Sequence, residues 1–173
     1  GWGVSGGDPS GGGQRGGEGP GGGRLREAGV LRPGIMESGH MAKALPKPLG
    51  KYPQLRRAGD TIYISGISAR LPDGSIDGVS REDGVVRRDV VQQTRRVLQN
   101  IATVLEGEGA SLDACIDITV FLTDAEDFAA YNTVYGEYFQ QNAPTRTTVI
   151  VQALPHPDMV VEAKAIAWIG PAE

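Results

Sequence analysis

The sequence has few of the residues that build metal centres and disulfides. Its 173 residues include one cysteine, Cys115, and two histidines, His40 and His156. A single cysteine cannot form an intramolecular disulfide or a cysteine-cluster zinc site. The sequence also lacks a glycine-rich phosphate loop and a nucleophile elbow. We therefore expect a protein that needs no metal and no cofactor.

Long apolar runs and an excess of positive charge are missing as well. No segment approaches the roughly 18 apolar residues that mark a transmembrane helix, which argues against a membrane protein. The net charge of −4 argues against nucleic acid as the main partner. The N-terminal region has no apolar stretch typical of a secretory signal, so we expect a cytoplasmic protein.

Glycine divides the chain into two parts. Sixteen of the 26 glycines lie in residues 1–40, where apolar side chains are few and isolated. Such a composition cannot bury enough surface to offset the entropy of the chain. We expect residues 1–44 to be a disordered leader, either a tag or a misassigned start, and residues 45–173 to form one domain.

Hydrophobic periodicity in this domain predicts the element order β-β-α-β-α-β-β. Helices are expected between Asp89 and Gly107, and between Thr123 and Asn142, each begun by a capping box. Residues 71–87 contain three glycines, a proline and many charges, and they predict a long surface loop. Strands are expected at 54–58, 61–65, 116–122, 147–153 and 160–169.

This order favours an α+β fold with one mixed sheet and both helices on one of its faces. The last two predicted strands are apolar on both sides, because Val149 alternates with Ile150, and Val160 with Val161. Two helices can cover only one face of such a sheet. The other face therefore predicts a partner subunit.

Two charged residues stand out because they lie on these apolar strands. Arg146 opens the strand after Pro144, and Glu162 follows two valines. A carboxylate among valines is costly unless it is paired or lies in a working cavity. Pattern alone leaves other interpretations open: Arg146 as a solvated strand end, and Glu162 as the partner of Lys164 in an ion pair within the strand.

Short motifs along the whole domain resemble the reactive intermediate deaminase family, also called Rid or YjgF. Each motif is weak by itself, and their order over about 120 residues carries the resemblance. Three of them, at 50–53, 154–157 and 162–165, are most similar to 2-aminomuconate deaminases. The matching segments are 50–54, 64–66, 93–95, 100–101, 120–122, 127–128, 131–135, 144–148, 154–155 and 162–167.

The resemblance implies a chorismate-mutase-like homotrimer, with the sheets in a central barrel and the sites in clefts between subunits. It assigns Arg146 to the substrate carboxylate and Glu162 to the positioning of water. It also implies that Tyr52 lines the site, and that the backbone of Ser65 and Gly66 faces the ligand.

The implied activity is the hydrolytic deamination of enamine or imine carboxylates, with 2-aminomuconate converted to 4-oxalocrotonate and ammonia. One alternative is a housekeeping deaminase of general 2-imino acids. Another is a non-catalytic trimer that binds small carboxylates and regulates a partner. A ribonuclease is a third alternative, against which the acidic composition counts.

Lys164 departs from the family pattern, which often has an acidic residue there. It is a candidate to bind the second carboxylate of a dicarboxylate, to lower the pKa of Glu162, or only to pair with it. If Lys164 does not bind that carboxylate, the remaining candidates are Lys51, Arg70 and His156. His156 is expected either at the rim of the cleft or in a surface turn.

The remaining predictions concern structural residues. Helical spacing places Tyr131, Tyr135 and Phe139 in the core, and Asn132 on another side, where a structural hydrogen bond is expected. Cys115 is expected to be a small buried hydrophobic residue. Arg56, Arg57, Arg87 and Arg88 are expected to be solvated.

Overall fold

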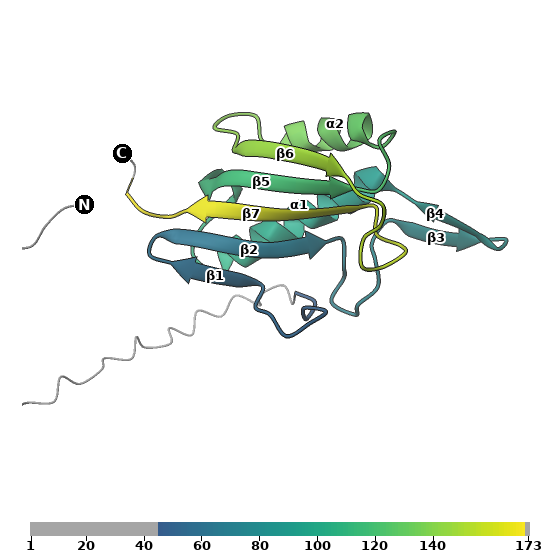
Figure 1. Ribbon diagram of the computed structural model, residues 1–173, viewed down its shortest axis with the longest axis horizontal. Coiled ribbons are helices and arrows are strands. Elements are labelled where there is room, and N and C mark those ends of the chain that lie inside the picture. The colour runs from purple at the N-terminus through teal and green to yellow at the C-terminus, as the bar shows by residue number, and fades with distance from the viewer. Residues whose placement is uncertain (1–44, 172–173) are drawn as a thin grey trace, which may run out of the picture. The chain divides into compact units, whose positions relative to one another are not determined.

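A computed structural model describes residues 45–171, so the predicted leader lies outside the described part of the chain. The main sheet has the strand order β1-β2-β7-β5-β6 (Figure 1). β5 and β6 are parallel, and the other neighbours are antiparallel. The elements are β1 Leu55–Ala58, β2 Thr61–Ser68, β3 Val79–Glu82, β4 Val85–Arg88, α1 Val90–Glu106, a 3₁₀ turn Leu112–Ala114, β5 Cys115–Leu122, α2 Phe128–Tyr138, β6 Thr145–Ile150 and β7 Val161–Trp168.

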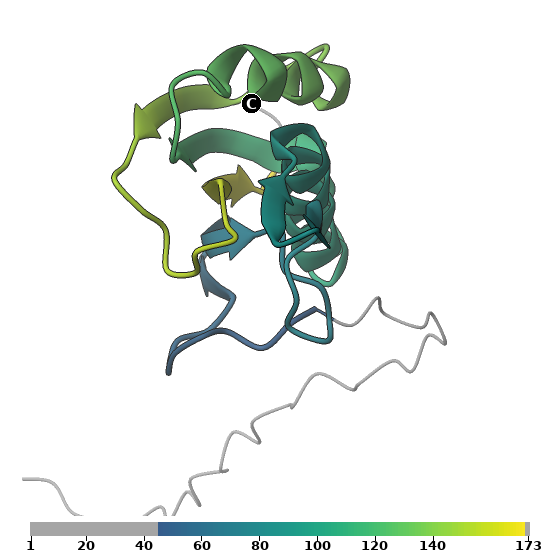
Figure 2. The same ribbon diagram turned by 90° about the vertical axis from the view of Figure 1, so that its right-hand side faces the viewer.

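Both helices lie on one side of the main sheet, as predicted (Figure 2). Alternation along the strands separates a helix-covered face from an open face. On β7, the odd-numbered residues from Val161 to Ala167 are buried, whereas the even-numbered residues from Glu162 to Trp168 are half-buried or exposed. The mixed α+β sheet expected from the sequence is therefore confirmed.

Helix α1 presents its apolar stripe to the sheet. Asp89 caps the helix, because its carboxylate accepts a hydrogen bond from the Gln92 backbone N–H at 3.0 Å. The side chain of Gln92 does not complete the predicted capping box, since its amide donates to Asp77 instead, at 2.8 Å. The helix ends at Gly107 as predicted. Its buried apolar residues are Val90, Val97, Leu98, Ile101, Val104 and Leu105.

The second predicted capping box, from Thr123 to Glu126, is wrong. Helix α2 begins later, at Phe128, and its N-cap Asp127 makes no side-chain cap bond. The backbone N–H of Glu126 instead donates to the carboxylate of Asp124 at 2.9 Å. A local turn thus takes the polar groups that the sequence pattern assigns to the helix.

The aromatic stripe of α2 and the single cysteine are buried, as predicted. Tyr131, Tyr135 and Phe139 are each less than a tenth exposed. Their rings follow one another, with centroid distances of 5.8 Å and 4.5 Å. Burial raises the pKa of the Cys115 thiol to about 11, so this group is an unreactive core residue.

The predicted loop at 71–87 contains two strands, and that prediction is wrong in this part. Strands β3 and β4 pair as an antiparallel hairpin that extends from the body beside the main sheet (Figure 1). Its turn residues Asp83 and Gly84 both have positive φ, 51° and 77°, which a tight hairpin turn requires. Every residue of β4 is exposed, so no burial-driven alternation marks these strands in the sequence.

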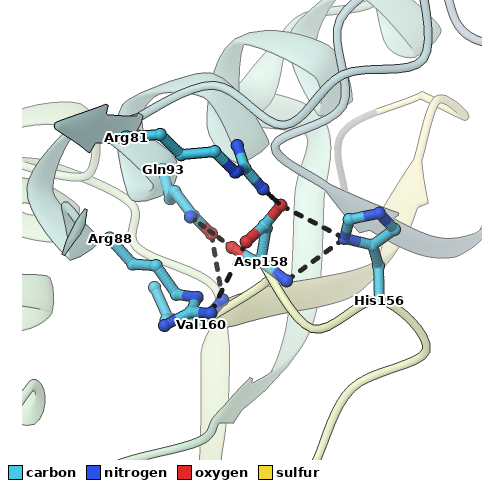
Figure 3. A network of polar contacts seen from close by, with 6 residues as sticks. All are labelled: Arg81, Arg88, Gln93, His156, Asp158 and Val160. Atoms are coloured by element: carbon cyan, nitrogen blue, oxygen red, sulfur yellow. Dashed lines mark hydrogen bonds and ion pairs between the residues drawn. The ribbon is translucent and has the colours of Figure 1, made fainter. Parts of the chain in front are cut away.

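The hairpin is attached to the body through Asp158 (Figure 3). The buried carboxylate of Asp158 pairs with Arg81 of β3 and with Arg88 of β4, the latter at 3.5 Å. Arg88 is exposed, as the sequence predicts, and it is also ion-paired. Gln93 of α1 donates to the Asp158 carbonyl at 2.8 Å and accepts from the Val160 N–H at 3.0 Å. These bonds fix the start of β7 against α1.

The open face of the main sheet carries large apolar side chains. Tyr63 of β2, Val149 of β6 and Trp168 of β7 are 49%, 39% and 42% exposed. The strand pairing puts all three on this face, away from the helices. Exposed apolar surface of this kind is typical of an interface.

Candidate functional site

Arg146 lies on β6 and points toward helix α2. Its guanidinium donates a hydrogen bond to the Asn132 side-chain oxygen at 2.9 Å. It also lies over the rings of Tyr135 and Tyr131, at 4.5 Å and 5.5 Å from their centroids. Arg146 is thus half-buried and held in place, and it is not a solvated strand end. The hydrogen bond expected for Asn132 is made to this arginine.

Three buried hydroxyls lie in the same region of the protein. Those of Tyr131, Tyr135 and Thr148 have no hydrogen-bond partner among the described residues. Burial raises the pKa of both tyrosines to about 12, although the positive charge of Arg146 acts in the opposite direction. The tyrosines therefore stay protonated, and their O–H groups remain available as donors beside the guanidinium.

Glu162 lies on β7 and points to the open face. It is half-buried and forms no ion pair with residues 45–171. Burial raises the pKa of its carboxyl above the ordinary value of 4.5. An unpaired, partly desolvated carboxylate with a raised pKa is a candidate acid–base group.

Gly66 makes room for this carboxylate. A Cβ atom at Gly66 would lie 2.5 Å from Oε1 of Glu162, so a larger residue there would displace the acid. The β2–β7 register shifts between Ile64 and Ile67, and this irregularity frees Ser65 and Gly66 from regular pairing. The sequence identifies Gly66 only through the family resemblance, and the close approach to Glu162 gives the physical reason for a glycine.

Four of the six predicted site residues line one pocket: Tyr52, Ser65, Gly66 and Glu162. Ser65 connects them to the segment before β1. Its hydroxyl donates to the Pro53 carbonyl at 2.8 Å, and its N–H donates to the Gln54 carbonyl at 2.9 Å. These two bonds hold the segment that carries Tyr52 along the edge of the pocket.

Arg146 does not reach this pocket within one chain. It pairs with Ile118 across β5 and β6, so it shares the helix-covered face with that core residue. Glu162 pairs with Phe121 across β5 and β7. Ile118 and Phe121 are three positions apart on one strand, so their side chains face opposite sides of the sheet. Arg146 and Glu162 therefore face opposite sides too.

Lys164 also lies outside the pocket. It is exposed on the open face and borders a separate groove with Pro53 and Tyr63. Its predicted ion pair with Glu162 is not formed. The proposal that it lowers the pKa of Glu162 is wrong as well, because burial raises that pKa.

His156 is a turn residue, the second of its two predicted placements. Its Nδ1 accepts a hydrogen bond from the Asp158 backbone N–H at 3.1 Å. The ring does not line the pocket of Glu162.

Within residues 45–171, no three side chains of His, Cys, Asp or Glu come together as metal ligands would. No helix in that part of the chain is long and apolar enough to span a membrane.

Comparison with known proteins identifies the family. The family described as Endoribonuclease L-PSP matches residues 42–169. A RutC family protein of Pyrococcus abyssi is 42% identical over 123 residues, which cover 71% of this chain and 90% of that protein. The chain belongs to the Rid/YjgF family. The resemblance read from the short motifs is thereby confirmed at the level of the family, and closeness to 2-aminomuconate deaminases is not shown.

Two further members of the Rid/YjgF family carry informative names. Reactive Intermediate Deaminase A of Arabidopsis thaliana is 33% identical over 111 residues, which cover 64% of this chain and 54% of that protein. The crystal structure of Escherichia coli TdcF with bound serine has a TM-score of 0.64 and 33% identity. It covers 74% of this chain and 95% of that one. Rid/YjgF relatives thus include a named deaminase and a protein that holds an amino acid.

Proposed function

We propose that this Rid/YjgF protein is a hydrolytic deaminase of enamine and imine carboxylates, with 2-aminomuconate as its substrate. The observation that carries the proposal is the state of Glu162. Its carboxyl is half-buried, unpaired within residues 45–171 and raised in pKa, and it lies in a pocket with Tyr52 and Gly66. A structural carboxylate on an apolar strand would have a cationic partner.

In the proposed reaction the substrate reacts as its 2-imino tautomer. Glu162 takes a proton from a water molecule, whose oxygen bonds to the imine carbon, and the carbon–nitrogen double bond becomes a single bond. The protonated Glu162 returns a proton to the nitrogen of this carbinolamine. Glu162 then takes the proton of the carbinolamine hydroxyl and passes it to the nitrogen, so that the carbon–nitrogen bond breaks, the carbon–oxygen double bond forms and ammonia leaves. From 2-aminomuconate the product is 4-oxalocrotonate, and one water is consumed for each ammonia released.

Arg146 would hold the carboxylate next to the reacting carbon. A guanidinium binds a carboxylate through two parallel hydrogen bonds, which fix orientation as well as affinity. Asn132 and the Tyr135 ring keep the guanidinium in place before substrate arrives. A bound carboxylate would also supply an acceptor for the hydroxyls of Tyr131 and Thr148, which have none within residues 45–171.

Because Arg146 and Glu162 face opposite sides of the sheet, a site that uses both needs two copies of the chain. We propose a homotrimer in which the Arg146 of one subunit meets the Glu162 pocket of the next. The exposed Tyr63, Val149 and Trp168 on the open face support such an assembly, since a central barrel would cover them.

Two relatives support the chemistry. The Arabidopsis protein is named a reactive intermediate deaminase, and the TdcF structure holds serine, which carries a carboxylate next to a carbon–nitrogen bond. A substrate such as 2-iminopropanoate has the same arrangement. A housekeeping deaminase that acts on general 2-imino acids is therefore the alternative: it catalyses the same reaction on a different substrate.

The test is ammonia release from freshly generated 2-aminomuconate and from 2-iminopropanoate, each against the uncatalysed rate. Faster release from 2-aminomuconate supports the proposal, and preference for 2-iminopropanoate supports the housekeeping alternative. Binding of carboxylates without acceleration of either reaction would identify a non-catalytic binding protein.

A further inference from the structure

We infer that Arg70 binds the second carboxylate of a dicarboxylic substrate. This inference rests on the proposed function and adds to it the residue that selects the substrate. A muconate-type substrate has carboxylates at both ends of a six-carbon chain. Arg146 of a neighbouring subunit would hold only the carboxylate beside the reacting carbon. The other end needs its own cationic partner, because a desolvated carboxylate without one is costly.

Arg70 lies on the same pocket as Glu162. It follows β2 directly, and Ser68, two residues earlier, is the strand partner of Glu162. The chain bends at Ala69, so Arg70 lies two residues beyond the strand partner of Glu162 and past the end of β2. Arg70 is therefore offset from Glu162, the group that activates the attacking water, as a group for the far end of the substrate must be.

Hydrogen bonds from helix α1 fix the backbone that carries Arg70. Asn100 of helix α1 donates from its side-chain amide to the carbonyls of Ser68 and Arg70, both at 3.0 Å. Arg70 also forms an isolated β-bridge with Ile76, which closes the turn behind it. The backbone at Arg70 is thus held in place, which lowers the entropic cost of ordering its side chain when a ligand binds.

The guanidinium of Arg70 retains donors for a ligand. One donor, Nη1, bonds to the Lys47 carbonyl at 2.9 Å, and this bond holds the group beside the segment that borders the pocket. A guanidinium has five N–H groups, so several remain for a carboxylate. Arg70 has no acidic partner within residues 45–171, unlike Arg81, Arg88, Arg95 and Arg96.

The competing cations fit less well. Lys164, the candidate favoured by the sequence, borders a different groove, and Lys51 and His156 do not line the Glu162 pocket either. Lys47 does line it, but its side chain is exposed and makes no hydrogen bond or ion pair with residues 45–171 that would orient it. Among these candidates Arg70 alone combines a place on the pocket with a fixed orientation.

The test compares two ligands that differ only in the second carboxylate: muconate, with two, and sorbate, the six-carbon diene with one. Calorimetry on the full chain should show muconate binding roughly 10- to 100-fold more tightly than sorbate, the scale of a charge-assisted contact. Arg70→Met should abolish that preference and leave sorbate affinity unchanged. Lys164→Met is the matched control and should keep the preference.

Three results would overturn the inference. The first is a preference for muconate that survives in Arg70→Met, and the second is a loss of this preference in Lys164→Met. The third is an equal loss of affinity for muconate and for sorbate in a folded Arg70→Met protein. Circular dichroism checks the fold. If Arg70→Met does not fold, Arg70→Gln removes the charge and keeps a donor for the Lys47 carbonyl.

Ammonia release is measured separately. Absence of turnover with both imine substrates would refute the deaminase while the binding result still decides the role of Arg70.

Discussion

Arg146 on β6 and Glu162 on β7 lie on opposite faces of the same sheet, with β5 between their strands. Arg146 is held by Asn132 and aromatic rings on the helix-covered side. Glu162 lies in a pocket with Tyr52 and Gly66. Each chain thus carries both halves of the proposed site, and it cannot bring its own halves together.

Substitution of these two residues should have different kinetic effects. The substrate carboxylate persists through the reaction, so Arg146→Met should raise KM roughly 10- to 100-fold, with a smaller fall in kcat. Glu162→Gln should lower kcat by roughly 10²–10⁴-fold and leave KM little changed, because it removes the acid–base step. Steady-state ammonia release measures both. Small, equal effects of both substitutions would indicate structural charges.

Gly66→Ala should reduce activity through Glu162. The added Cβ would lie 2.5 Å from the carboxylate oxygen, so the acid must move, and a displacement near 1 Å can cost about 100-fold in rate. Gly136→Ala is the matched control, because a Cβ on that α2 glycine meets nothing within 4 Å. The control should keep full kcat and gain about 0.5–1 kcal/mol of stability. Full activity in Gly66→Ala would show that the position of Glu162 is not critical.

Stability should depend on pH through Glu162. Because the folded-state pKa of this carboxyl is raised above 4.5, folding favours its protonated form. Its contribution to stability is present below pH 4.5 and is lost as the pH rises through the raised pKa. Glu162→Gln should therefore increase Tm at neutral pH, and the increase should vanish below pH 4.5. A lower Tm at neutral pH would instead indicate a cation that pairs with Glu162 across a subunit interface.

Hydrophobic periodicity predicts most of the helices and strands, because the burial of their apolar residues determines where they form. The main-sheet strands and α1 each place apolar residues against one core, so their spacing marks them. Periodicity does not reveal the β3–β4 hairpin, because all of β4 is exposed. The hairpin is attached through Asp158, which is 77 residues from its partner Arg81 in the sequence. The capping box at Thr123 fails because the Asp124 turn competes for the same backbone groups.

The candidate site is only partly readable from sequence. Glu162 and Arg146 are conspicuous because charge on an apolar strand needs a reason. Their opposite orientation follows from strand order and register, which local patterns do not contain. Lys164 is two residues from Glu162 and is therefore the obvious second cation, yet it borders another groove. Arg70 reaches the pocket through a strand pairing and the Asn100 anchor, and neither is visible in the sequence.

The oligomeric state should be a trimer in solution. The exposed Tyr63 and Trp168 on the open face call for a cover that residues 45–171 of a single chain do not supply. Light scattering at micromolar concentration should give about three times the chain mass. Trp168→Lys should weaken the assembly and the activity together, because the proposed site needs two subunits. A fully active monomer would contradict a site that needs two subunits.

Each proposed site takes Arg146 from one subunit and Glu162 from another, and mixed trimers test this arrangement most directly. At substrate concentrations well below KM, the Arg146→Met and Glu162→Gln proteins should each have only a small fraction of wild-type activity alone. When they are refolded or co-expressed together in equal amounts, random assortment should give about one quarter of the sites an intact arginine and an intact glutamate. Ammonia release should recover accordingly, whereas mixing Arg146→Met with the Arg146→Met/Glu162→Gln double variant should give no recovery. If verified mixed trimers of the two single variants stay as inactive as their parents, the site does not combine these residues from different subunits.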